Sequence, residues 1–368
     1  MAEYSPFINA AASVVLGRLR KKPLLWYVTY FITNKCNLRC PYCYAVTNRI
    51  FNTGKLADKS NKLKEPTIDE IFKTIDDLYK IGTRYICLLG GEPLVRKDLK
   101  EIIGYIKSKK MMVALNTNGT LIDQNIEVLR MLNKLTISLE GDKEKHDKDR
   151  GAGTYEQIIR NIRLLKENNF KNFSIQMTVS TNTLSSWEHV LQLAKEVSCT
   201  VLITEVACRP GENLKEAGFS QAQLHLLWSR IYELKRNGYP IENSYEAISN
   251  VLKYSQHIGP FQIFSGSEML PEPLKEFVKY HKCPMGKYSS FLDSDGTFYP
   301  CATLFGAKGY NIHELSTRKA YEAMSRDESC KCCRMLLNYQ INYLFSSLNP
   351  FTLFHLALLA LKKYSYRG

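Results

Sequence analysis

Features that a secreted or nucleic-acid-binding protein would show are missing from this sequence of 368 residues. The apolar stretch at residues 10–16 is short and runs directly into basic residues, so it does not predict a cleaved signal peptide. We therefore expect a reducing cytoplasm, where clustered cysteines indicate metal sites rather than disulfides. The net charge is +14, but the basic residues are spread along the chain without a recognisable nucleic-acid-binding module. Nucleic acid is therefore not an expected partner.

The overall composition excludes neither a large core nor a second module. Hydrophobic residues make up 45% of the chain and charged residues 23%, as in ordinary globular proteins. The length is sufficient for a full core and two modules. Eleven cysteines are many for a cytoplasmic chain, so their spacing is the main guide to function.

Three cysteines, Cys36, Cys40 and Cys43, have the spacing CxxxCxxC. No fourth cysteine or histidine follows in the adjoining loop, although a zinc site would require one. Three thiolates can hold a [4Fe–4S] cluster and leave its fourth iron open, whereas electron-transfer clusters usually have four cysteine ligands. The triplet follows an apolar run at residues 26–32 that predicts a strand. The predicted cluster thus lies in the loop after a strand, where α/β folds place their chemistry.

Strands and helices are predicted to alternate up to about residue 210. Such alternation implies parallel strand pairing with right-handed crossovers. The periodicity predicts strands at 26–32, 84–89, 112–116, 134–139, 173–179 and 200–206, and helices at 67–80, 99–109, 121–133, 155–168 and 185–197. The number of units does not itself distinguish a flat sheet from a barrel.

Motifs at the ends of these strands resemble those of the radical S-adenosylmethionine (SAM) superfamily. Tyr42 precedes the last cysteine of the triplet, and Gly90-Gly91-Glu92-Pro93 follows the second strand. The segments at 115–119 and 136–142 come next, in the order that the family shows. The resemblance covers about residues 24–210. It implies an α/β fold with a partial (β/α)6 TIM-type barrel, and reductive cleavage of SAM to a 5′-deoxyadenosyl radical.

The resemblance also implies a set of SAM contacts. The two glycines would let the backbone approach the methionine amino group closely. Alternating polar residues at the end of the fourth strand resemble those that meet the ribose or the carboxylate, and the arginine would pair with the carboxylate. Turn formation and capping, or a surface salt bridge for the arginine, are the alternative roles. The predicted contacts are Gly90, Gly91, Glu92, Asn116, Asn118, Ser138, Glu140 and Arg150.

Five cysteines follow residue 282 and predict a second cluster. The first two flank Asp295-Gly296, a hairpin signal. The pattern resembles the auxiliary-cluster extension called SPASM, or its half-length form Twitch, and five cysteines are too few for the two clusters of the full form. We therefore expect one auxiliary Fe–S cluster, of the [4Fe–4S] type. Its predicted ligands are Cys283, Cys301, Cys330 and Cys333, with Cys332 in place of Cys330, or zinc in place of iron, as alternatives.

The stretch at 335–361 contains no Lys, Arg, Asp or Glu. It is too interrupted by polar residues to span a bilayer. Short helices that lie in the membrane interface, with basic residues beside them, fit its composition better, and the N-terminal segment has a similar pattern. Packing over the ends of the barrel, or a subunit interface, would explain the same residues.

We therefore expect five segments: 1–23 amphipathic, 24–210 core barrel, 211–282 helical linker, 283–334 auxiliary-cluster domain and 335–368 apolar helices. The expected function is radical chemistry on a C–H bond or double bond of an apolar substrate such as a membrane lipid. The enzyme would be cytoplasmic, at the inner face of the membrane, with a ferredoxin or flavodoxin as electron donor. Radical modification of a ribosomally made peptide or protein is the first alternative, and a nonenzymatic Fe–S binding protein is the second. The sequence leaves the substrate, the later reaction steps and the oligomeric state open.

Overall fold

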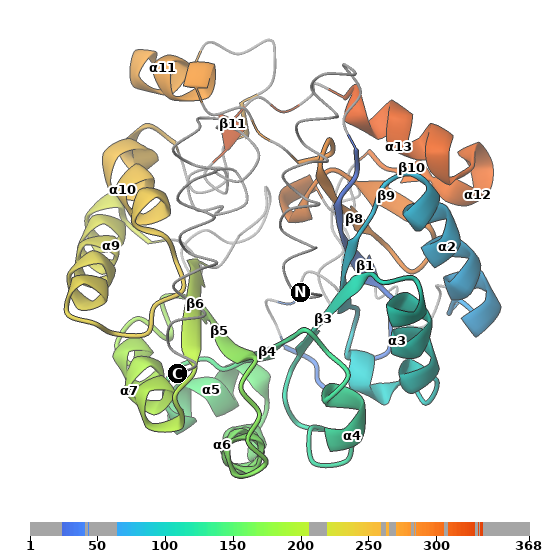
Figure 1. The fold of residues 1–368 in the computed structure, drawn as a ribbon. Coiled ribbons are helices and arrows are strands. Elements are labelled where there is room, and N and C mark those ends of the chain that lie inside the picture. The colour runs from blue at the N-terminus through green and yellow to red at the C-terminus, as the bar shows by residue number, and fades with distance from the viewer. Residues whose placement is uncertain are drawn as a thin grey trace, which may run out of the picture.

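One curved sheet with helices on its outer side forms most of the fold (Figure 1). The computed structural model describes residues 24–40, 43, 65–205, 219–258, 263–264, 270–280, 283, 285–304, 308–327, 330 and 332–333. The predicted terminal segments at 1–23 and 335–368 lie outside these residues. Among the described residues, no helix has the length and apolar character needed to cross a membrane.

Six parallel strands lie side by side in chain order, which confirms the predicted parallel pairing. Figure 1 shows them as an arc, as expected of a partial barrel. Their C-terminal ends all point to the same edge of the arc, because the strands are parallel. The strands are β1 (Tyr27–Phe31), β2 (Tyr85–Leu89), β3 (Met112–Thr117), β4 (Lys134–Ser138), β5 (Phe173–Val179) and β6 (Thr200–Glu205).

The convex face of the sheet is apolar and packs against the helices. In α2 the residues Ile71, Ile75 and Leu78 recur at helical spacing and are fully buried. Burial of each such side chain stabilises the fold by roughly 1.5–3 kcal/mol. A capping box between Thr67 and Glu70 fixes the start of this helix. The helices are α2 (Ile68–Lys80), α3 (Leu99–Ser108), α4 (Ile126–Leu129), α6 (Thr154–Glu167) and α7 (Trp187–Val197).

Two helices differ from the sequence-based expectation. The predicted helix at 121–133 is reduced to α4, which begins after Asn125. It ends early because the backbone N–H groups of Met131 and Leu132 bond to the carbonyl three residues before them, as in a 3-10 turn. The helix α5 (Lys143–Arg150) was not predicted, because nearly all its residues are charged and give no apolar periodicity. The side chain of Asp142 caps its first turn.

A C-terminal hairpin extends the barrel sheet. Strand β8 (Ser289–Leu292) pairs in parallel with β1, and β9 (Thr297–Tyr299) pairs with β8 in antiparallel fashion. The predicted turn is present, with Gly296 at a φ of +81°. The division into a 24–210 barrel and a 283–334 domain stays a prediction, although the two share this sheet. Strand β10 (Tyr310–Asn311) completes the sheet, and the nearby short elements are η3 (Ala302–Leu304), α12 (Ile312–Leu315) and α13 (Thr317–Ser325).

The described residues between barrel and hairpin are mostly helical. It contains α9 (Gln221–Arg236), α10 (Tyr245–Tyr254), η2 (Ser255–His257) and α11 (Glu272–Tyr280). A separate two-stranded sheet joins β7 (Ile263–Phe264) to β11 (Cys332–Cys333). A distant part of the chain therefore fixes the last two cysteines.

Candidate active site

The loop that carries the cysteine triplet begins at the C-terminal end of β1 and is held by the carboxylate of Glu65. Its oxygens accept the hydroxyl of Thr33 and the backbone N–H of Asn34, both at 2.7 Å. Arg96 donates to the carbonyl of Ile32 at 2.8 Å. The start of the loop is therefore fixed before the first cysteine.

The three cysteines of the triplet are shielded from solvent to different degrees. Cys36 and Cys43 are half-buried and Cys40 is buried. Burial raises the pKa of Cys36 to about 11 and also raises the pKa of Cys40. A cluster would bind them as thiolates, so binding would release protons. The backbone N–H of Leu38 points at the sulfur of Cys36 at 3.4 Å, and such bonds stabilise cluster thiolates. The donor set therefore fits an Fe–S cluster.

Among the described residues, no three His, Cys, Asp or Glu side chains lie close enough together to bind a single metal ion. The irons of a [4Fe–4S] cluster each take their own thiolate, so the ligands need not converge on one point. The triplet stays a predicted set of cluster ligands.

Gly90 and Gly91 pack against the backbone of the cysteine loop. A Cβ on Gly90 would lie 2.5 Å from the carbonyl oxygen of Thr33, and one on Gly91 would lie 2.1 Å from that of Lys35. The N–H of Gly91 donates to Thr33, and that of Glu92 donates to Lys35. Close backbone approach is therefore the reason for both glycines, but the chain itself is the partner that they approach. Their contact with SAM stays a prediction.

Glu92 is fully buried and uses both carboxylate oxygens within the protein. One oxygen accepts the hydroxyl of Thr117 at 2.7 Å and the N–H of Leu94 at 3.1 Å. The other accepts the N–H of Asn118 at 2.6 Å. Burial raises the pKa of this carboxyl to about 7, against the effect of its three donors. Glu92 thus joins the ends of β2 and β3 and positions the residues around it.

Asn118 links the end of β3 to the cysteine loop. Its side-chain amide donates to Asn37 at 2.8 Å and lies 3.9 Å from the sulfur of Cys36. Its carbonyl oxygen accepts the N–H and the hydroxyl of Thr120, which in turn accepts from Asn37. The turn-forming role considered for Asn118 is therefore present. Asn116 accepts instead from the thiol of Cys87 at 3.5 Å.

Arg150 and Glu140 form a buried ion pair beside the triplet. The guanidinium donates to Glu140 at 2.6 Å, and the two side chains are 10% and 1% exposed. Arg150 therefore does form a salt bridge, but this salt bridge is buried and not on the surface. The second oxygen of Glu140 accepts the N–H of Thr178 at 2.7 Å, which ties β4 to β5. The charge of Arg150 lowers the pKa of Cys40 and opposes the larger effect of burial, so this ion pair lies near the triplet.

His146, on the unpredicted helix α5, is fully buried and contacts the backbone of Glu140. Its Nδ1 accepts the N–H of Glu140 at 3.0 Å, which places the proton of the neutral ring on Nε2. Burial and, to a smaller extent, the charge of Arg150 together lower the pKa of His146 to about 3. Ser138, the other predicted residue at this strand end, is half-buried.

The C-terminal cysteines differ in burial. Cys283, Cys301 and Cys330 are half-buried, whereas Cys332 is 1% exposed and belongs to the main hydrophobic core. Cys333 follows Cys332 in β11. Burial in the core favours Cys332 as the cysteine that is not a ligand. The auxiliary ligand set stays a prediction.

Sequence reasoning missed an aromatic patch between the two groups of cysteines. Phe31, Phe291 and Tyr299 form a small buried cluster of their own, and Cys36 and Cys43 pack against it from the triplet loop. Met285 and Ala302 pack against it from the hairpin side. Residues in β1 and in a hairpin so much later in the chain share no sequence motif, so only the pairing of β1 with β8 brings them together.

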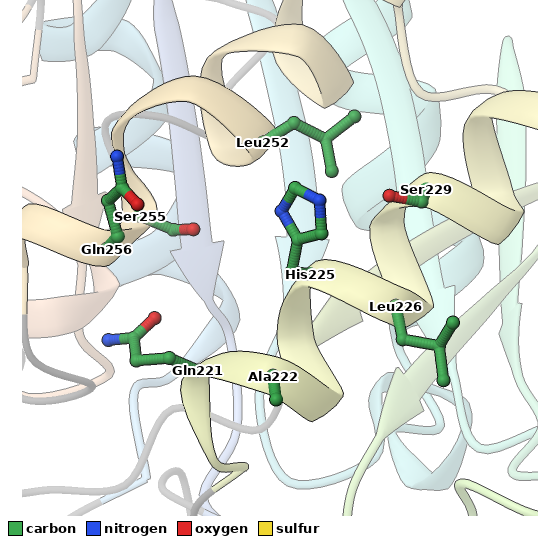
Figure 2. Close-up of a pocket in the computed structure, with 8 residues that line it drawn as sticks. All are labelled: Gln221, Ala222, His225, Leu226, Ser229, Leu252, Ser255 and Gln256. Carbon is green, nitrogen blue, oxygen red and sulfur yellow. The ribbon is translucent and has the colours of Figure 1, made fainter.

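A hollow of about 410 Å3 lies between α9 and α10, away from the strand ends that carry these residues. Figure 2 shows Gln221, His225 and Leu226 on one side of it and Leu252 and Gln256 on the other. Leu226 is 71% exposed. None of the predicted site residues lines this hollow, so the candidate active site is the edge of the sheet and not this groove.

A family model described as the radical SAM superfamily matches residues 30–194. An AdoMet-dependent heme synthase of Methanosarcina barkeri is 29% identical over 307 residues, which are 80% of this chain and 81% of that protein. An Fe-coproporphyrin III synthase of the same organism is 28% identical, over 60% of this chain and 55% of the relative. A probable GTP 3′,8-cyclase of Methanococcus vannielii is 32% identical, over 47% and 56%. The chain thus spans little more than half the length of the last two relatives.

Among solved structures, Streptococcus suis SuiB bound to the precursor peptide SuiA has a similar fold. The TM-score is 0.63 at 15% sequence identity, and the likeness covers 90% of this chain and 78% of that chain. At this identity, the likeness concerns the fold alone.

Proposed function

This chain belongs to the radical SAM superfamily, and from that premise we propose that it cleaves SAM reductively at a [4Fe–4S] cluster bound by Cys36, Cys40 and Cys43. When bound, the cluster and SAM together supply a 5′-deoxyadenosyl radical that abstracts hydrogen from a substrate. The chain itself orients both groups and keeps water from them.

One observation carries this proposal. The loop with the triplet is fastened to the ends of β2 and β3 by the close packing of Gly91 on Lys35 and by the side chain of Asn118. N–H groups of Leu38 and Asn118 also point toward the sulfur of Cys36. A loop held this firmly can present three thiolates in fixed directions, which an open cluster requires.

We place SAM over the strand ends next to this loop. The ion pair of Arg150 and Glu140 can exchange one bond for a bond to the SAM carboxylate or ribose, since both residues lie close enough to Cys40 for their charges to act on its pKa. Glu92 does not contact SAM directly in this proposal, because its oxygens already accept three protein donors. The residues proposed to form or support the SAM site are Gly90, Gly91, Glu92, Asn116, Asn118, Ser138, Glu140 and Arg150.

We further propose one auxiliary Fe–S cluster in a SPASM- or Twitch-like region, with Cys283, Cys301, Cys330 and Cys333 as ligands. The half-buried state of Cys283, Cys301 and Cys330 supports this set. The aromatic patch between hairpin and triplet would separate the two clusters.

The substrate is bound, in this proposal, on the concave face of the sheet below SAM. The apolar or membrane-lipid substrate favoured by the sequence rests on segments outside the described residues, and so does peripheral membrane contact. Peptide modification is the second candidate, since SuiB has the same fold and was solved with a precursor peptide. A ferredoxin or flavodoxin would supply the electron.

The test is formation of 5′-deoxyadenosine from SAM by anaerobically reconstituted, dithionite-reduced protein. The variant Cys36→Ala should reduce formation to background. The matched control is Cys199→Ala, which removes a buried core thiol far from the triplet in sequence and should keep both activity and bound iron. Formation retained in a folded Cys36→Ala protein would contradict the proposal.

A further inference from the structure

The half of the concave face that β3 to β6 form is mainly polar, in contrast to the convex face of the sheet. Strand side chains alternate between the two faces, and the register aligns Asn116 with Thr136 and Thr136 with Ser174 on adjacent strands. The residues between them, such as Leu135 and Ile175, belong to the hydrophobic core under the helices. Asn116, Thr136 and Ser174 therefore form one polar row across β3, β4 and β5.

A second row lies nearer to the predicted SAM site. Ser138 of β4 is aligned with Gln176 of β5, and Thr178 is aligned with Thr204 of β6. The two threonine hydroxyls lie 3.5 Å apart. Hydroxyl and amide groups thus line much of this half of the concave face as far as the end of β4, where Glu140 follows, although Leu202 of β6 is aligned with Gln176 and Ala114 of β3 lies on the same face.

The polar rows include hydrogen-bonding capacity that the described protein does not use. The hydroxyl of Ser174 is buried, with the residue 1% exposed, and has no hydrogen-bond partner among the described residues. Buried polar groups nearly always have a partner, so this hydroxyl is a polar group that the described residues leave unsatisfied. Ser138 and Gln176 are only half-buried, and an alkyl chain placed on them would cover their polar groups without offering hydrogen bonds.

This half of the face offers no unpaired fixed charge in the described strands. Lys134 is the one charged side chain that β1 to β6 direct to the concave side, and its ammonium group pairs with Glu242. A carboxylate or phosphate group would need a cation there. The charged pair of Arg150 and Glu140 lies at the rim, at the proposed SAM site.

The other half of the concave face is aromatic. Strand parity and register place Tyr27 and Phe31 of β1 and Tyr85 of β2 on it, with Phe291 of β8 packed beside Phe31 at 6.2 Å between ring centroids. A substrate between the two halves would meet rings on one side and hydrogen-bonding groups on the other.

We propose that the part of the substrate that contacts this face is an uncharged group that bears hydroxyl or amide functions. The inference rests on the proposed function and names its substrate class. It disfavours both an alkyl chain and an anionic group at the site of hydrogen abstraction. A neutral small metabolite and a stretch of peptide share the proposed chemistry.

The test uses cells that produce this protein, grown in deuterated medium. Their extract is divided into a lipid phase presented as vesicles, a peptide fraction, and an aqueous small-molecule fraction split on anion-exchange resin into flow-through and eluate. Each is given to reduced protein with unlabelled SAM. A C–D bond of the substrate breaks homolytically, its deuterium atom forms a new bond to C5′ of the adenosyl group in place of the broken C5′–S bond, and the substrate is left as a carbon-centred radical. Dithionite supplies one electron per SAM, and methionine leaves.

Deuterated 5′-deoxyadenosine should form several-fold faster with the resin flow-through or the peptide fraction than with the other fractions. Label that comes only from lipid vesicles or only from the anionic eluate would overturn the inference. Unlabelled 5′-deoxyadenosine without any deuterium transfer would also overturn it while leaving SAM cleavage intact. No 5′-deoxyadenosine in any tube would instead reject the proposed function.

A pair of variants locates the effect on the concave face. Thr136→Val removes a hydroxyl from the polar row, and the deuterated fraction of the product should fall roughly tenfold, the effect of one hydrogen bond. Thr74→Val makes the same change at an equally buried threonine in α2, whose hydroxyl donates to Glu70. It should leave the deuterated fraction unchanged. Equal effects of the two variants would contradict the assignment of the face.

Discussion

At the scale of single residues, Gly91 is constrained by the chain rather than by a ligand. Its missing Cβ leaves room for the carbonyl group of Lys35, and the backbone there cannot move without moving the cysteine loop. The GGEP motif could be recognised in the sequence, but its partner could not, because residues 33–35 carry no pattern of their own. A motif can therefore be read correctly while the contact that explains it is found only in the fold.

We expect Gly91→Ala to displace the triplet and to lower the iron bound per chain after reconstitution to a small fraction of the wild-type value. Iron analysis and circular dichroism would separate loss of the site from loss of the fold. Gly104→Ala is the matched control, since its Cβ would meet only a methionine methyl group at 3.9 Å. It lies within α3 and should keep full iron and gain roughly 0.5–1 kcal/mol of stability. A Gly91→Ala protein that binds as much iron as the wild type would show that the cysteine loop can shift to accommodate the Cβ, and would contradict this prediction.

The burial of His146 predicts a pH dependence of stability. Its folded pKa of about 3 lies below its ordinary value of 6.5, so the unfolded chain binds the proton first as pH falls. The contribution of His146 is complete above pH 6.5 and decreases as pH falls toward 3. Between pH 7 and pH 5 the loss should be about 2 kcal/mol.

His146→Asn removes the titrating ring but can keep the bond from the N–H of Glu140. We expect it to lower the free energy of unfolding at pH 7 by about 1–3 kcal/mol through lost packing, and to show less loss than wild type on going to pH 5. Urea unfolding at both pH values would measure this difference. His225→Asn changes an exposed histidine and should behave as wild type. An unchanged pH dependence in His146→Asn would contradict this explanation.

At the scale of elements, the amphipathic pattern of a segment predicted its helix correctly, whereas a segment of mostly charged residues gave no prediction. The apolar spacing of α2, α6 and α7 predicted these helices because each covers the sheet. In the helix α5 only His146 is fully buried, and the charged sequence of the helix gives no such signal. The helix nonetheless supports the predicted site, since it carries both His146 and Arg150. Arg150 could be predicted as a site residue from the family motif, whereas His146 and the helix that holds both residues could not.

The hairpin of β8 and β9 should stabilise β1, because β8 pairs directly with it. Gly296→Ala places a Cβ 2.7 Å from the ring of His313 at a φ of +81°, so it should strain the hairpin turn. Hydrogen exchange measured by mass spectrometry should become faster in β8, β9 and β1 but not in β5 or β6. Gly238→Ala has the same φ and open space around it, and should cost only about 1–2 kcal/mol. Unchanged exchange in β1 would mean that the strand does not depend on the hairpin.

At the scale of the whole molecule, sequence predicted the parallel barrel but not how its two cysteine-bearing regions are joined. The ordered motifs indicated the barrel through family resemblance. The pairing of β1 with β8 depends on residues too far apart for any local pattern, and the same pairing creates the aromatic patch. In contrast, the sequence shows the alternation of polar and apolar residues in β4 and β5. Only the strand register shows that the polar residues of the two strands lie side by side on the concave face.

The proposed second cluster predicts the iron content of the whole protein. Cys301→Ala should lose about half of the iron that the reconstituted wild type binds, and Cys332→Ala should keep all of it because that thiol is buried in the core. Iron and sulfide analysis would measure both. Full iron in Cys301→Ala, or a loss in folded Cys332→Ala, would contradict the proposed ligand set.

The pairing of β1 with β8 also affects how the protein is made. The ribosome synthesises Ser289, the partner of Tyr27, 262 residues after Tyr27 itself. At ordinary translation rates this delay is on the order of 10 to 50 seconds. Throughout that time one edge of β1 has no neighbour, and an open strand edge can pair with another chain. The nascent protein should therefore depend on chaperones, and the aromatic wall beside the cysteine triplet can close only near the end of synthesis.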